Sequence, residues 1–132
     1  MTYLLDSNTL IDLFKNTGAV RQRMAQHKDI DLRLCTPVLW ELLAGAFMAQ
    51  NGSSQLSRLK ELENRLTVLP FDLDSARQAA KTSAHLERIG TPIGTVDTMI
   101  SGIALAHDLT IITRNTREFE RVPGLRVENW YD

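Results

Sequence analysis

The sequence predicts an α/β protein, a three-layer α/β/α sandwich with a central, mostly parallel sheet. Two patterns support this fold. Short apolar or alternating runs, which are typical of strands, recur along the chain, and longer segments with apolar residues at helical spacing lie between them. The 132 residues, of which 43% are hydrophobic, are enough for one ordinary domain with its own core. We therefore expect a single domain over residues 1–132.

The first half of the chain is expected to contain two strands and three helices. They are a strand at 3–5, a helix from 7 that Gly18 breaks, a polar helix at 19–27, a strand at 31–35 and a helix at 36–50. Asp6 or Ser7 can cap the first helix, and Thr36-Pro37 is a strong start signal for the third. That third helix is apolar nearly all round, so we expect it to be central and buried.

The second half of the chain is expected to continue the alternation. A helix carrying Leu56, Leu59, Leu62 and Leu66 is followed by a strand at 68–70, a helix at 72–89, a helix at 95–107, and strands at 110–113 and 125–130. The glycine-flanked loop Gly90–Gly94 separates the last two helices, and Thr95 can cap the second of them. Strands that alternate with helices imply a parallel sheet covered on both faces.

Three carboxylates stand almost alone in apolar surroundings. Asp6 closes the first apolar run, Glu41 is the only charged residue between positions 33 and 58, and Asp97 is the only formally charged one between positions 88 and 108. A buried, isolated carboxylate is strongly disfavoured unless it is paired, protonated or bound to a metal. Three such residues in three separate elements suggest a shared cation.

Each of these carboxylates also has a simpler interpretation. Asp6 can serve only as a helix cap, and Asp97, which lies near a helix start, can serve only as a partner of the helix dipole. Glu41 can form a structural salt bridge, although an unpaired glutamate in such an apolar helix would be costly. Taken jointly, the three residues favour a metal site.

Their expected places in the fold bring the three carboxylates toward one cleft. In open parallel sheets, sites form beyond the carboxyl ends of the strands, where Asp6 lies. Glu41 follows the second strand by about a turn and a half of helix, and Asp97 lies in the first turn of its helix. Carboxylates without histidine or thiol companions match Mg²⁺ or Mn²⁺ rather than zinc. Such ions serve the cleavage of phosphate esters, where they activate water and neutralise charge.

Several short motifs follow one another along nearly the whole chain. They are Leu5-Asp6-Ser7-Asn8, Glu41-Leu-Leu-Ala-Gly45, Thr91-Pro-Ile-Gly94 followed by Asp97, Thr113-Arg-Asn-Thr-Arg-Glu-Phe119, Val122-Pro-Gly-Leu125 and Glu128-Asn-Trp130. Their order and combination resemble PIN-domain ribonucleases and, more narrowly, the VapC toxins of bacterial toxin–antitoxin pairs. The resemblance implies a Mg²⁺-dependent endoribonuclease that cleaves structured RNA, often tRNA. It also implies a cognate VapB antitoxin and a homodimer.

The resemblance assigns roles to individual residues. The implied metal ligands are Asp6, Glu41 and Asp97, with Mn²⁺ able to replace Mg²⁺. Asn8 would not bind the metal ion itself but would hold Asp6 in position. Many PIN domains have a fourth acid just after the strand that ends here at Thr113, but this chain has Asn115 at that place. Asn115 could ligate or position a water through its carbonyl group, and Glu118 could replace the missing acid, so we expect one metal ion rather than two.

Positive charge is concentrated near the same expected edge. The arginines concerned are Arg114, Arg117, Arg121 and Arg126. They could grip RNA phosphates, and the net charge of −1 makes such a local patch necessary for binding RNA. The alternative is a solvated surface on which these arginines pair with Glu118, Glu120 and Glu128.

The rest of the composition narrows the class of protein. One cysteine, Cys35, excludes an internal disulfide and is expected in the core of a protein from a reducing cytoplasm. No apolar run approaches the roughly 20 residues of a membrane-spanning helix. We therefore expect a cytoplasmic protein with no membrane partner.

Two other functions compete with RNA cleavage. A phospho-receiver domain also binds Mg²⁺ at strand ends, but it usually has an adjacent acidic pair early in the chain and a lysine near the end. Here Ser7 and Asn8 follow Asp6, and no lysine occurs after Lys81. The second alternative is a PIN-like module that has lost catalysis and only binds RNA or protein. The reason to consider it is Asn115, which stands where many PIN domains have an acid.

Overall fold

The computed structural model describes residues 1–132 and contains one five-stranded sheet in the order β3-β2-β1-β4-β5. All neighbouring strands are parallel. The strands are β1 (Tyr3–Leu5), β2 (Leu32–Cys35), β3 (Thr67–Leu69), β4 (Thr110–Ile112) and β5 (Arg126–Glu128). The helices are α1 (Ser7–Lys15), α2 (Val20–Met24), the 3₁₀ turn η1 (Asp29–Asp31), α3 (Thr36–Met48), α4 (Ser53–Arg65), α5 (Leu73–Arg88), α6 (Thr95–Ala106) and α7 (Thr116–Phe119).

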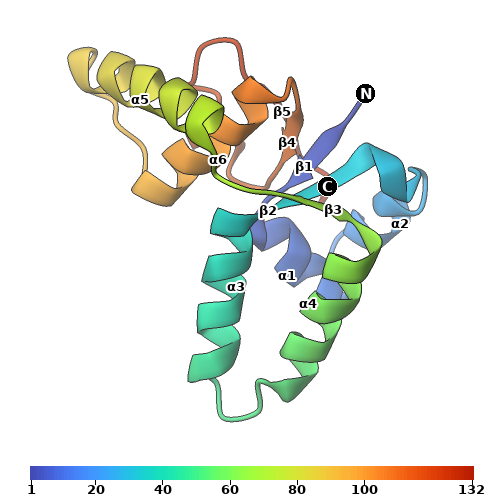
Figure 1. Ribbon diagram of the computed structural model, residues 1–132. Helices are drawn as coiled ribbons and strands as arrows, with labels where there is room; N and C mark the ends of the chain where they lie inside the picture. The colour runs from blue at the N-terminus through green and yellow to red at the C-terminus, as the bar shows by residue number, and fades with distance from the viewer.

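Helices cover both faces of the sheet, which confirms the predicted three-layer α/β/α class. Figure 1 shows α3 and α4 as a helical hairpin that extends from the sheet with α1 near its base, while α5 and α6 lie together on the other side. The chain leaves β1 toward β2 and β3 and later returns to the other side of β1 as β4 and β5. The order therefore reverses between β1 and β4, and ligand sites in open α/β sheets form at the carboxyl side of such a point.

The core lies where the two central strands meet the helices. Leu4, Leu5, Ile111 and Ile112 are completely buried, as expected for strands that are covered on both faces. Cys35 is buried among them, and burial raises the pKa of its thiol to about 12. The prediction that Cys35 is a core residue is therefore confirmed. No helix of the structure has the length and apolar character needed to cross a membrane.

Helix α3 corrects one expectation from the sequence. It begins at Thr36 as predicted, but it is not buried all round. Trp40, Phe47 and Met48 are 63%, 72% and 87% exposed. The helix packs its other side against its neighbours and extends beyond the edge of the sheet (Figure 1). An apolar pattern on every side of a helix shows that it is apolar, but it does not show what covers each side.

Two element boundaries also differ from the expectation, and one further helix is present. Helix α1 ends at Asn16, whose left-handed backbone (φ 54°) makes it the C-cap, and not at Gly18. Thr95 is the first residue of α6 and the preceding Gly94 is its N-cap, without a side-chain hydrogen bond. The four-residue helix α7 was not expected, because so short a segment has no full apolar period.

Helices α5 and α6 approach each other unusually closely at Gly102. A Cβ atom at this position would collide with the Ser75 carbonyl oxygen and with Ala79 of α5. The absence of a side chain therefore permits the packing that holds α6, and with it Asp97, against the rest of the domain.

Candidate active site

Asp6 lies at the carboxyl end of β1, next to the point where the strand order reverses. Its backbone N–H donates to the Ile112 carbonyl oxygen of β4 (2.9 Å), which extends the ladder by one residue. The residue is only 3% exposed. Its Oδ1 accepts from the backbone N–H of Ser7 (2.8 Å), and its Oδ2 accepts from the Thr113 hydroxyl (2.7 Å). Asp6 is thus the N-cap of α1, as the simpler interpretation required, while its second oxygen faces the end of β4.

The charge of Asp6 is held in a poor environment for a carboxylate. Burial raises its pKa, and the hydrogen bonds from Thr113 and Ser7 oppose this rise without cancelling it. A carboxylate that is this deeply buried and has no cationic partner would be stabilised by a bound cation. The feature predicted from the sequence is therefore present at Asp6.

Glu41 is exposed, which corrects the expectation that it is buried within α3. It lies on the second turn of the helix, and the Ser7 hydroxyl donates to its Oε1 (3.2 Å). Ser7 thereby bridges Glu41 and Asp6. Partial burial, and after it the charge of Asp6, raises the pKa of Glu41, while the hydrogen bond from Ser7 opposes this rise. The salt bridge considered for Glu41 does not occur.

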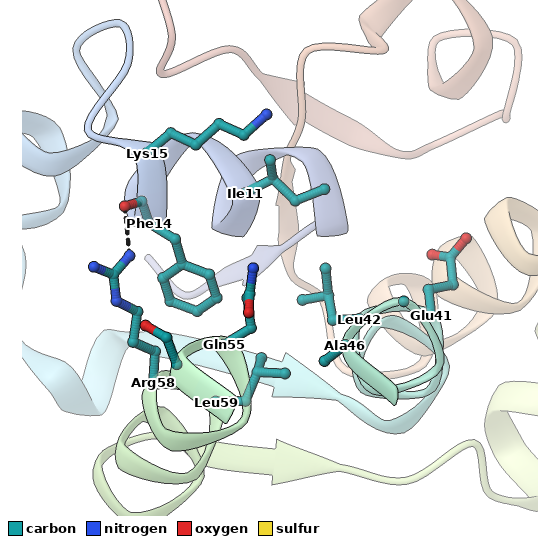
Figure 2. A pocket seen from close by; sticks show the side chains of 11 residues that line it. Ile11, Phe14, Lys15, Glu41, Leu42, Ala46, Gln55, Arg58 and Leu59 are labelled. Carbon is teal, nitrogen blue, oxygen red and sulfur yellow. Dashed lines mark hydrogen bonds between the residues drawn. The ribbon is translucent and has the colours of Figure 1, made fainter. Parts of the chain in front are cut away.

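A groove of about 330 Å³ between α1, α3 and α4 begins beside Glu41. Figure 2 shows Glu41 at one end of it, Lys15 and Arg58 at the other, and the side chains of Phe14 and Leu42 between them. Arg58 is fixed in this groove because it donates to the Phe14 carbonyl oxygen (2.6 Å). The groove therefore joins the acidic site to an apolar surface.

Asp97 lies in the first turn of α6 and carries the largest perturbation in the site. Its pKa is raised to about 7, first by burial and then by the charge of Asp6, a hydrogen bond and charge interaction with Glu118, and the charge of Glu41. These contributions show that the four carboxylates share one electrostatic environment. The charges of Asp6, Glu41 and Glu118 therefore all act on Asp97, and the assignment of these residues to one metal site stays a prediction.

Asn115 and Glu118 lie on the short segment that follows β4. The Asn115 side-chain amide donates to Glu118 Oε2 (2.8 Å), and Glu118 lies close enough to Asp97 to raise the pKa of that carboxyl. Asn115 therefore orients the glutamate that approaches Asp97. This arrangement supports the sequence-based alternative in which Glu118 supplies the acid that is absent at position 115.

Thr113 is a central residue of the site that sequence reasoning did not select. Its hydroxyl donates to Asp6 Oδ2 and accepts from the backbone N–H of Asn115 (3.0 Å) and from the Asn8 side-chain amide (3.3 Å). Asn8 also accepts from the backbone N–H of Arg114 (3.1 Å). Asn8 thus supports Asp6 through Thr113, not directly. Thr113 follows β4, which is parallel to β1, so it lies at the same edge of the sheet as Asp6. Its place at the end of a predicted strand was the signal by which the sequence could have identified it.

The arginines do not form the single patch that the sequence suggested. Arg126 begins β5 and pairs with Asp108 (2.9 Å), at the amino edge of the sheet and away from the carboxylates. Arg114 pairs with Asp12 (3.4 Å), and Arg121 donates to the Pro92 carbonyl oxygen (3.3 Å). The alternative pairing with Glu118, Glu120 and Glu128 does not occur either. Arg117 is exposed on α7, close to Glu118 in sequence.

The donor set of the site fits a hard divalent cation. All candidate ligands are oxygens. Burial raises the pKa of Asp6, Glu41 and Asp97, neighbouring carboxylates add to the rise at Glu41 and Asp97, and a cation would relieve both effects. No three acidic, histidine or cysteine side chains are placed to hold one ion between them. One or two direct carboxylates with water in the remaining positions is the arrangement that Mg²⁺ commonly adopts.

Removal of the Thr113 hydroxyl tests how far this network supports Asp6. We expect Thr113→Val to weaken Mn²⁺ binding by about 10- to 100-fold, because a hydrogen-bonded neighbour that orients a ligand is lost. The same change should lower the free energy of unfolding by about 1–3 kcal/mol, because a buried carboxylate oxygen loses its partner. Calorimetric Mn²⁺ titration and urea unfolding measure the two effects. Thr82→Val, at a buried threonine of α5, is the matched control, and equal Mn²⁺ affinities in both variants would contradict the expectation.

Three comparisons with known proteins agree with this architecture. The family model described as PIN domain matches residues 3–125. The chain is 37% identical to the tRNA(fMet)-specific endonuclease VapC of Shigella flexneri, over 98% of both proteins. It is 31% identical, again over 98% of both, to ribonuclease VapC1 of Haemophilus influenzae strain R2866. The crystal structure of DNA-bound VapBC from Salmonella typhimurium matches with a TM-score of 0.90 and 34% identity over 98% of each chain.

A parallel α/β/α fold with carboxylates gathered at its switch point defines the class of this protein as a small α/β nuclease. The chain belongs to the PIN-domain family and, within it, to the VapC ribonucleases. The resemblance predicted from the order of the motifs is confirmed. PIN-domain nucleases of this type depend in general on divalent metal ions.

Proposed function

We propose that this protein is a Mg²⁺-dependent endoribonuclease toxin and that Asp6, Glu41 and Asp97 bind its metal ion. The observation that carries the proposal is the shared electrostatic environment of these residues at the reversal of the strand order. The similarity to VapC ribonucleases over nearly the full length supports the same chemistry. Mn²⁺ should replace Mg²⁺, because both prefer oxygen ligands.

The residues of the site divide the work of hydrolysing an RNA phosphodiester. Asp6 and Asp97, with Glu41 at the exposed side, would hold the cation, one or two of them directly and the others through water, and the bound cation would neutralise charge on the phosphate and lower the pKa of water. Ser7 keeps Glu41 beside Asp6. Glu118, oriented by Asn115, lies close enough to Asp97 to raise the pKa of that carboxyl, and it would face the cation from the same side. Of the four arginines predicted as RNA contacts, Arg117 is the one without an ion pair or hydrogen bond, so we assign the phosphate contact to it first.

The substrate that we propose is a tRNA. Two relatives, from Shigella flexneri and Salmonella typhimurium, are tRNA(fMet)-specific endonucleases, and the second is 36% identical over 98% of both chains. Cleavage of such an RNA would stop translation. The partly exposed position of Glu41 and its groove supports a large substrate, because a folded RNA can reach the site without entering a closed cavity.

We further propose that a VapB-type antitoxin is the protein partner of this chain. Solved VapBC complexes from Salmonella typhimurium and Rickettsia felis contain chains that match this one with TM-scores of 0.90 and 0.87. The exposed apolar side chains of α3 provide surface that suits a protein partner. A homodimer stays a prediction from the family resemblance.

Cleavage of defined RNA tests the proposed function. Purified protein is incubated with total bacterial tRNA and Mg²⁺, and the ends of the products are sequenced. We expect discrete cuts in one or a few tRNAs by the wild type and none by Asp6→Asn. The proposal is wrong if Asp6→Asn cleaves as fast as the wild type or if neither protein cleaves. Tight binding of tRNA without cleavage would instead identify a module that has lost catalysis. Two observations favour that alternative: Asn115 stands in the place of the fourth acid, and no three side chains are placed to hold one metal ion.

A further inference from the structure

Asp12 is a second buried carboxylate, on the opposite side of α1 from solvent, and the site described above does not use it. It is 5% exposed. Its Oδ1 accepts from the Thr17 hydroxyl (3.0 Å) and from Arg114 Nη1 (3.4 Å), while its Oδ2 is buried without a hydrogen-bond partner. A buried carboxylate with one unpaired oxygen is costly, so the ion pair with Arg114 is the contact that makes this position tolerable.

Arg114 is held on both sides. Its guanidinium lies 3.9 Å from the centroid of the Tyr131 ring, a distance at which a cation and an aromatic face attract each other strongly. Tyr131 is itself fixed, because its carbonyl oxygen accepts from the backbone N–H of Ala19 (2.7 Å) and its ring lies against Gly18, where a Cβ atom would collide with it. We call the contact of Asp12, Arg114 and Tyr131 the Arg114 clamp.

The Arg114 clamp acts on the segment that completes the carboxylate site. Asn8 and Asp12 are four residues apart and therefore lie on one face of α1. Asn8 binds the backbone of Arg114, and Asp12 binds its side chain. The residues on either side of Arg114 are Thr113, which bonds Asp6, and Asn115, which orients Glu118. The place of Arg114 thus determines the place of two neighbours in the site.

We propose that Asp12 is a positioning residue, which acts through Arg114 and Tyr131 to fix the segment 113–118 against α1. Arg114 is then a structural residue and not an RNA contact, because its charge is already engaged by a buried anion and an aromatic ring. The inference deepens the proposed function, on which the catalytic part of its test rests. The clamp itself is defined by contacts within the chain and is testable without any substrate.

Amide hydrogen exchange measures the clamp directly. The backbone N–H groups of Arg114 and Asn115 are bonded to the side chains of Asn8 and Thr113. We expect Asp12→Asn, Arg114→Met and Tyr131→Leu each to speed their exchange by about tenfold, because the segment opens locally more often. Tyr131→Phe keeps the ring and should retain the wild-type rates. Arg126→Met, which breaks an ion pair at the far edge of the sheet, is the matched control and should leave both rates unchanged.

Metal binding and kinetics then separate positioning from RNA contact. If the clamp positions the site, the three disruptive variants weaken Mn²⁺ binding and lower kcat about tenfold at nearly constant KM. In that case the double variant Asp12→Asn with Arg114→Met has the same kcat and Mn²⁺ affinity as either single variant. If Arg114 instead contacts RNA, Arg114→Met raises KM and leaves exchange unchanged, while Asp12→Asn, which frees the arginine, lowers KM. That second pattern overturns the inference. If the wild type cleaves no RNA, exchange and Mn²⁺ binding still decide the clamp. If Asp12→Asn fails to fold, Arg114→Met and Tyr131→Leu, which change the less buried residues of the contact, decide it.

Discussion

Replacement of Asp97 by asparagine is expected to lower kcat for RNA cleavage by about 100- to 1,000-fold, because a metal ligand supplies several kcal/mol of transition-state stabilisation. The same variant should be more stable than the wild type above pH 7 when no divalent ion is present. Asparagine keeps the size of the side chain and removes the charge that Asp6, Glu118 and Glu41 repel. Loss of activity with a gain in stability is the signature of a functional carboxylate.

The pH dependence follows from the direction of the shift. The pKa of Asp97 is raised in the folded protein from 3.8 to about 7, so the folded state binds a proton that the unfolded state releases. Stability of the wild type therefore falls as the pH rises through this window, and the loss is complete above it. In Asp97→Asn the fall attributable to this group is absent, so the two stability curves should coincide near pH 4 and separate toward pH 8. Thermal unfolding measured across this range, in EDTA, checks the prediction.

Asp74→Asn is the matched control for Asp97→Asn. Asp74 also lies in the first turn of a helix, α5, but it is exposed and is not one of the carboxylates of the candidate site. A simple partner of the helix dipole loses a little stability, about 0.3–1 kcal/mol, when it is neutralised. If Asp97→Asn behaved like Asp74→Asn and kept full activity, Asp97 would be only a dipole partner.

Removal of the metal ion is expected to abolish cleavage, and excess Mg²⁺ or Mn²⁺ should restore it. Binding should also stabilise the fold, since a ligand at about 100 times its Kd raises the free energy of unfolding by roughly 2.7 kcal/mol, or about 10 °C in Tm for a domain of this size. Cleavage assays with and without EDTA, together with thermal unfolding of the same samples, measure both effects. Activity that persists in EDTA would refute the metal mechanism.

The affinity for the metal should depend on pH. A cation and a proton compete for Asp97, whose pKa is about 7, so half-saturation with Mn²⁺ should require about tenfold less ion at pH 8 than at pH 6. Glu118→Gln is the informative variant. Glu118 raises the pKa of Asp97 by its charge and its hydrogen bond, so glutamine should move this dependence to lower pH. An unchanged profile would mean that Glu118 does not influence the pKa of Asp97.

The sequence predicted the fold class because the signals for that class are local. The helices begin close to Asp72 and Thr36 as capping and proline chemistry indicate, and the apolar strands lie where the short runs occur. The same local reasoning failed for α3. Apolar residues on all its sides suggested burial, but Trp40 and Phe47 face solvent because the helix extends past the sheet.

The candidate site was predicted in part for a similar reason. Asp6, Glu41 and Asp97 were visible because each is isolated in its own segment, and the chain order of their motifs indicated the family. Asp6 is buried as expected, however, whereas Glu41 is exposed. Isolation in sequence describes the neighbours along the chain, whereas burial depends on elements that arrive from elsewhere.

The sequence by itself determined the α/β class, the family, and the oxygen-donor chemistry of this protein, because those follow from residue types, spacing and order. Only the tertiary structure decided which groups meet. The Thr113 hydroxyl donates to Asp6, which is 107 positions away in the sequence, and Ser7 connects Asp6 to Glu41. Arg114, which was expected in an RNA-binding patch, instead pairs with Asp12. These contacts arise because parallel pairing of β1 with β4 brings their carboxyl ends together. The energy of each contact depends on the distance between its two groups and on their burial, and no single segment of the chain determines either quantity.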